Sequence, residues 1–141
     1  MIWIPYALIT AFALAAADFL VKLAAGKLSN SLGLLIYGSC TFLAGLGWVV
    51  WQKFNGATQF AQANGVWAAL GVGVSFSIVT IGLYATFGAG APISVASPII
   101  RLGGLLLAGL AGVILLREPL TLRYTIGVAL VLGGMYLVVT R

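Results

Sequence analysis

Long apolar runs alternate with short polar segments along the whole chain. A helix needs about 20 apolar residues to cross the hydrocarbon core of a bilayer, and its backbone has to satisfy its own hydrogen bonds there. Runs of this kind predict helices over about residues 2–25, 32–51, 65–87, 93–116 and 122–139. The predicted fold is therefore all-α, an integral membrane protein with five transmembrane helices in a single domain over residues 1–141.

The polar segments between these runs have the composition of turns. They cover residues 26–31, 52–64, 88–92 and 117–121. The last segment is so short that the two helices it joins are predicted to be antiparallel neighbours. Small residues recur at four-residue spacing on these two helices, at Gly104, Ala108 and Gly112 and at Ala129 and Gly133. Such faces let helix backbones approach closely in lipid, either inside one subunit or at a subunit interface.

The composition narrows the class of protein. Hydrophobic residues make up 62% of the 141 residues and charged residues 6%, whereas a soluble domain carries about 25% charged residues. This excludes a soluble fold and predicts a multi-pass protein of the cell inner (plasma) membrane. The seven basic residues lie singly between apolar runs, so no nucleic-acid partner is expected. With no histidine, one cysteine and two carboxylates, neither an enzyme, a metal site nor a cofactor is expected.

The basic residues of the predicted loops divide evenly between the two sides of the membrane. Five crossings place Lys53, Arg117 and Arg123 on the side of the N-terminus, and Lys22, Lys27 and Arg141 on the other. Orientation normally follows an excess of Lys and Arg on the cytoplasmic side. In one interpretation of this tie, copies insert both ways and pair as an antiparallel homodimer. In the other, a subtler signal sets one orientation.

Arg101 is the most informative single residue. It lies about 12 Å into the fourth predicted helix, too deep to reach the interface by its stem. A charge at such a depth costs at least about 2.5–3.5 kcal/mol, so Arg101 is expected to face the bundle interior or a wet cavity. It is predicted either to anchor an anionic group of a substrate or to bridge to Asp18 or to backbone carbonyls. Pro98 cannot donate to the helix and predicts a bend, and thus a gate or binding niche, where Ser97 supplies a hydroxyl.

Asp18 and Lys22 lie four residues apart on the first predicted helix, in the favourable order for an ion pair. Lys22 is close to the helix end, which leaves Asp18 as the more demanding group to bury. The pair is interpreted either as a carboxylate that exchanges a proton or a cationic substrate for its basic partner, or as a structural bridge. Tyr37 lies deep in the second predicted helix, where it either lines a cavity or packs.

Glu118 stands beside Arg117 in the last polar segment. At the end of a membrane helix such a side chain is solvated or lies among headgroups. It is expected to bridge to Arg123 or to cap the fifth helix, which starts near Thr121, and not to serve catalysis.

The run LLREPLT over residues 115–121, followed by IGVALVLGG over residues 126–134, resembles the end of an EamA-type domain of the drug/metabolite transporter superfamily. In that pattern a Gly-Glu pair and a short polar turn precede an Ile-Gly helix with a later Gly. Lys22 resembles the lysine that such domains often carry at the end of helix one. Arg101 resembles a basic residue of the short, single-domain members. Arg117, in place of glycine, and Asp18 depart from the pattern.

The resemblance implies a chain that forms one five-helix EamA-like repeat. Full-length relatives have two such domains in inverted orientation, so a one-domain chain is expected to form a homodimer around a central pathway. The expected function is transport of a small metabolite or drug by alternating access, with Arg101, Asp18, Lys22, Tyr37 and Ser97 as the substrate-binding residues. The alternative is a membrane assembly partner that does not transport, or a subunit of a lipid-linked-sugar flippase.

Overall fold

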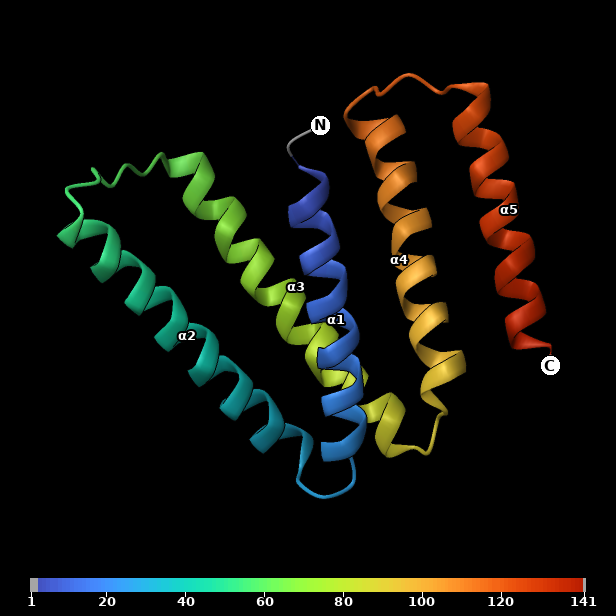
Figure 1. Ribbon diagram of the computed structural model, residues 1–141, viewed down its shortest axis with the longest axis horizontal. Coiled ribbons are helices and arrows are strands. Elements are labelled where there is room, and N and C mark those ends of the chain that lie inside the picture. The colour runs from blue at the N-terminus through green and yellow to red at the C-terminus, as the bar shows by residue number, and fades with distance from the viewer. Residues whose placement is uncertain (1–2, 141) are drawn as a thin grey trace. The chain divides into compact units, whose positions relative to one another are not determined.

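A computed structural model describes residues 3–140. These residues form five helices: α1 (Ile4–Ala24), α2 (Asn30–Phe54), α3 (Ala63–Gly88), α4 (Ile93–Leu115) and α5 (Leu122–Val139) (Figure 1). Each is long and apolar enough to cross a membrane, and no β-strand forms in the described part of the chain. The predicted all-helical fold with five spans is confirmed at this level. The predicted start at Ile2 and the basic residue Arg141 lie outside the described residues.

Two helices extend further than their apolar runs predict. α2 begins at Asn30 because the Ser29 side chain caps it, accepting a hydrogen bond of 3.4 Å from the backbone N–H of Leu32. It then continues past the apolar run to Phe54. α3 likewise begins at Ala63, within the predicted connection. In α2 the apolar run marks the part of the helix that suits lipid, whereas the Ser29 cap sets where the helix starts.

Contacts divide the chain into two compact units, residues 1–89 and 90–141, and each is described by itself. In the first unit α3 packs against both α1 and α2. The three helices converge where α1 ends and α2 begins, and α2 and α3 diverge toward their other ends (Figure 1). We call the convergent region the narrow end. The buried residues of the first unit lie on the helix segments that meet there: Asp18, Gly33, Thr80, Leu83, Tyr84 and Phe87.

Gly33 marks the close approach of α2 to α3 at the narrow end. A Cβ atom built on Gly33 would lie 2.6 Å from Cζ of Tyr84, nearer than real Cβ contacts allow. The Tyr84 ring therefore occupies the space that any other residue at position 33 would need. Small residues serve helix contacts in lipid in this way, because they let a neighbouring helix reach the backbone.

The second unit consists of α4 and α5, which pack as antiparallel neighbours, as predicted (Figure 1). Between them the chain reverses at Arg117, whose φ of 55° is in the left-handed region. The reversal brings the backbone N–H of Glu118 to the carbonyl of Gly112, at 3.2 Å. The prediction that Glu118 caps α5 is wrong, because Thr121 is the cap and its side chain accepts from the N–H of Tyr124 at 3.3 Å.

Large apolar side chains remain exposed on all five helices. Phe12 on α1 is 77% exposed, and Leu130 on α5 is 72% exposed. An aqueous surface of this kind would aggregate, whereas lipid chains or a second copy of the chain cover it without cost. The fold therefore has the outer surface that a multi-pass membrane protein requires.

Candidate functional site

Asp18 is a buried carboxylate inside an apolar helix. It is 2% exposed and lies about 9 Å before the end of α1, at 1.5 Å per residue. α1 packs against α3, which supplies Thr80, the other buried polar residue among residues 3–140. A carboxylate at this depth is costly and in membrane proteins commonly serves transport or proton relay. The structure thus places Asp18 in the interior, as its charge predicted.

Lys22 lies one turn after Asp18 and is half-buried. Its ammonium nitrogen stands 5.7 Å from the centroid of the Phe87 ring, a cation–π arrangement. Phe87 itself is 3% exposed near the end of α3. The spacing of four puts Asp18 and Lys22 on one face of α1, and the Phe87 contact shows that this face is turned to α3. The narrow end therefore holds two ionisable groups and an aromatic ring.

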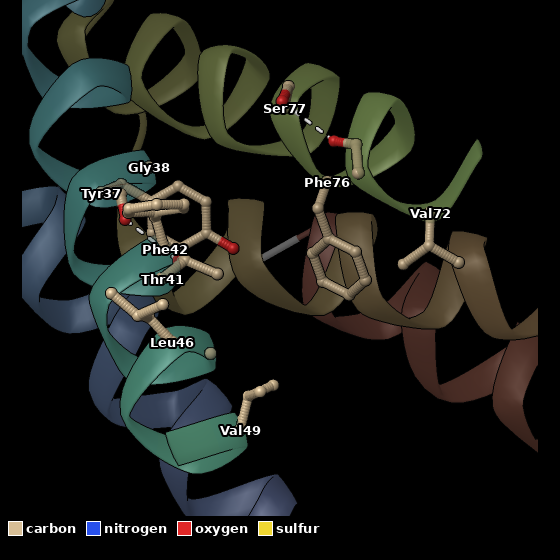
Figure 2. Close-up of a pocket in the computed structure, with 11 residues that line it drawn as sticks. Tyr37, Gly38, Thr41, Phe42, Leu46, Val49, Val72, Phe76 and Ser77 are labelled. Atoms are coloured by element: carbon tan, nitrogen blue, oxygen red, sulfur yellow. Dashed lines mark hydrogen bonds between the residues drawn. The ribbon is translucent and has the colours of Figure 1, made fainter. Parts of the chain in front are cut away.

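A cleft separates α2 from α3 beyond the narrow end. Its volume is about 780 Å³. The lining residues are Tyr37, Gly38, Thr41, Phe42, Gly45, Leu46 and Val49 from α2, and Val72, Gly73, Phe76 and Ser77 from α3 (Figure 2). Figure 2 shows Tyr37 and Phe76 projecting into this space from the two helices. The volume is within the range of small-molecule sites, and the lining of this open cleft is mostly apolar with a few polar groups.

Three hydroxyl groups line the cleft. Thr41 donates to the carbonyl of Tyr37 at 3.0 Å, and Ser77 donates to the carbonyl of Gly73 at 2.9 Å. Both hydroxyl oxygens keep acceptor capacity after this bond. The Tyr37 hydroxyl is engaged by no hydrogen bond within residues 3–140, so it can donate to a ligand. Thr41 and Ser77 lie near the middle of their helices, both of which are long and apolar enough to cross a membrane.

The cleft and the charged residues of α1 occupy different places. Gly33, whose contact with Tyr84 closes the narrow end, lies one turn before Tyr37 on α2. The cleft opens from there, and its lining includes neither Asp18 nor Lys22. Of the predicted substrate-binding residues in the first unit, Asp18 and Lys22 thus lie on one face of α1 at the narrow end, and Tyr37 lines the cleft.

The remaining predicted site residues lie on α4, in the second unit. Ser97 and Arg101 are four positions apart on this helix, and both are half-buried, as is Pro98. Each of the two polar side chains takes part in interactions. α4 runs without interruption from Ile93 to Leu115 with Pro98 inside it, and the bend and gate stay predictions.

Sequence reasoning missed Phe87, Thr41 and Ser77 as site residues. For the two hydroxyls a signal existed, because each lies on a helix face with glycine: Gly38 and Gly45 flank Thr41, and Gly73 precedes Ser77 by one turn. Phe87 carried no local signal, since its partner Lys22 is remote in the chain. Residues 3–140 contain no group of three His, Cys, Asp or Glu side chains that could hold a metal ion.

Comparison of the chain with models of protein families, with curated proteins and with solved structures gives no match. The site must therefore be interpreted from its own chemistry. Aromatic faces, hydroxyl acceptors and one tyrosine donor can hold a small, largely apolar molecule in the cleft. The charges of α1 can bind or exchange a proton or another ion.

Proposed function

We propose that the chain is a membrane transporter of a small metabolite or drug that works by alternating access as an antiparallel homodimer. The observation that carries the proposal is the cleft between α2 and α3, with Thr41 and Ser77 near the middle of helices that are long and apolar enough to cross a membrane. A surface that only faces lipid gains nothing from hydroxyls at that depth, whereas secondary transporters bind their substrates near the bilayer midplane.

The charges within the helices support the same proposal. Asp18 is buried, and Lys22 and Arg101 are half-buried, all in helices that suit the bilayer. Intramembrane charges of this kind are rare and usually belong to substrate or ion pathways. We assign Asp18 and Lys22 to ion or proton exchange, and Arg101 to an anionic group of the substrate.

Arg117 bears on the resemblance to EamA-type domains. The family pattern has glycine before the glutamate, and Arg117 occupies this position with a φ of 55°, a conformation that favours glycine. Arg117 thus has a backbone conformation that the glycine of the family pattern would adopt without strain. This supports the proposed family likeness and, with it, pairing of two copies in inverted orientation in the cell inner membrane.

The alternative function is a membrane assembly partner. The internal hydrogen bonds of Thr41 and Ser77 support it, because hydroxyls satisfied by their own helix can also be buried in a contact between helices that binds no ligand. Transport by purified protein in liposomes separates the two functions. A panel of solutes is first screened for thermal stabilisation, and uptake of each hit is then measured. Arg101→Ala and Asp18→Asn are expected to abolish uptake while folding and insertion persist. Their loss of expression without any separable activity would support the assembly function.

Thr41→Val tests the cleft directly. Valine keeps the shape but removes the hydroxyl, and loss of one hydrogen bond of about 1 kcal/mol lowers apparent substrate affinity about fivefold. Thr10→Val is the matched control, because Thr10 makes the same bond to a carbonyl four residues earlier, at 2.8 Å on α1, outside the cleft. Equal uptake by both variants would place substrate binding elsewhere.

A further inference from the structure

A second groove lies between α4 and α5. It has a volume of about 450 Å³. Its lining runs from Leu106 to Val113 on α4 and from Tyr124 to Leu132 on α5, and it includes Leu120 of the turn. The few polar atoms in this lining are largely engaged or covered: Thr125 donates to the carbonyl of Thr121 at 3.3 Å, and the Tyr124 hydroxyl lies against Gly109. The groove therefore offers a hydrocarbon surface and little else.

The groove extends over most of the thickness of one bilayer leaflet. On α4 its lining runs from Leu106 to Val113, which is about 11 Å at 1.5 Å per residue. On α5 its lining runs from Tyr124 to Leu132, which is about 12 Å. The hydrocarbon core is about 30 Å thick, so one leaflet contributes about 15 Å. A lipid acyl chain that enters at the turn would fill the groove along its whole length.

Two arginines lie near the end of the groove that is next to the α4–α5 turn. Arg117 precedes Leu120 in the turn, Arg123 lies in the first turn of α5, and both are exposed. Neither forms an ion pair within residues 3–140, so the predicted bridge from Glu118 to Arg123 is not made. The Glu118 carboxylate lies against α4, where its Oε2 atom is 2.7 Å from the position of a Cβ on Gly112. The two guanidinium groups thus remain available to an anion at headgroup level.

We infer that the α4–α5 groove binds an anionic phospholipid, with one acyl chain between the helices and the headgroup phosphate at Arg117 and Arg123. Guanidinium groups pair well with phosphate, and the N-terminus of α5 adds a favourable dipole. A basic site between helices at the membrane surface is a known form of lipid recognition. The bound lipid would fill a space in the contact between α4 and α5 that side chains leave open.

Native mass spectrometry of the full chain tests the inference. The protein is released from a neutral detergent in the presence of equal phosphatidylglycerol and phosphatidylcholine with identical acyl chains. We expect preferential retention of phosphatidylglycerol. In the variant Arg117→Gly/Arg123→Gln this preference should fall about 25-fold, at about fivefold per basic residue. Glycine suits the backbone at position 117, so the variant removes the charge without straining the turn.

Two further variants make the test specific. Lys27→Gln/Lys53→Gln removes the same charge from other loops and should keep the preference. Val128→Phe fills the groove and should lower retention of both lipids. An equal loss in the lysine variant, no preference in the parent chain, or unchanged retention in Val128→Phe would each overturn the inference. The inference would also be overturned if the parent chain formed a dimer without bound lipid and Val128→Phe dissociated that dimer. A second copy of the chain would then occupy the groove. These readouts measure lipid, so their failure leaves the transport proposal untouched.

Discussion

Replacing Gly33 with alanine would put a methyl group against the ring of Tyr84. The new Cβ would lie 2.6 Å from Cζ and 2.7 Å from Cε2, whereas carbon atoms in contact need about 3.5–4.0 Å. The ring would have to move by about 1 Å, yet Tyr84 is only 9% exposed. Overpacking of this kind costs about 1–3 kcal/mol. Alanine also favours the helix by about 1 kcal/mol over glycine, so the net loss is expected to be up to about 2 kcal/mol.

Gly47→Ala separates the two terms. Gly47 is on the same helix, and a Cβ there would meet nothing within 4 Å, so this variant keeps the gain in helix propensity without overpacking. Unfolding of the detergent-solubilised protein by increasing sodium dodecyl sulfate, followed by circular dichroism, gives both free energies. The free energy of unfolding of Gly33→Ala is expected to be about 1–3 kcal/mol below that of Gly47→Ala.

A second substitution tests the assigned cause. Tyr84→Leu removes the ring atoms that the new methyl group would meet, so in this background Gly33→Ala should lose most of its cost. The coupling free energy from the double-mutant cycle isolates this contact. Equal stability of Gly33→Ala and Gly47→Ala, or a cost that persists without the Tyr84 ring, would show that α2 and α3 do not meet at Gly33.

Three further predictions concern the Lys22–Phe87 contact, the turn at Arg117 and the orientation of the chain in the membrane. Phe87→Leu should lower the free energy of unfolding by about 0.5–2 kcal/mol, and its effect should shrink in a Lys22→Met background if the cation–π contact is the cause. Arg117→Gly should raise the free energy of unfolding by about 1 kcal/mol, because glycine adopts positive φ without strain; a loss in the same titration would contradict the turn. Reporters fused to the C-terminus should be active in both compartments, since the loop charges favour neither orientation, and activity in one compartment alone would rule out dual topology.

The helices were predictable because the requirement for a membrane span is local. A run of about 20 apolar residues identifies a span without knowledge of its neighbours. The ends of α2 and α3 were not predictable from hydropathy, since the side chain of Ser29 sets the start of α2 and polar residues continue both helices beyond their apolar runs. The Glu118 cap was wrong for a related reason. The left-handed residue Arg117 turns the chain so that Thr121 reaches the free N–H groups of α5.

The site was predictable only in part. The high cost of a charge in lipid predicts that Asp18 is interior, and the structure buries it. The partner of Lys22 and the cleft around Tyr37 depend on how α1, α2 and α3 pack. The rotation of each helix about its own axis decides which side chains face a neighbour, and the sequence of a single helix does not give it. Thr41 and Ser77 each look like ordinary helix hydroxyls, because both bond to their own backbone.

The first unit places its two kinds of polar group on either side of one contact. Gly33 and Tyr84 hold α2 to α3 at the narrow end, near the segments that carry Asp18 and Lys22, while the hydroxyl-lined cleft opens beyond them. Under the proposed transport function, the width of the cleft has to change while one part of the α2–α3 pair stays joined. The Gly33–Tyr84 contact is the part that we expect to stay joined, because Tyr84 is buried and its ring lies directly against the Gly33 backbone. Gly33→Ala should therefore lower transport as well as stability, whereas Gly47→Ala should lower neither.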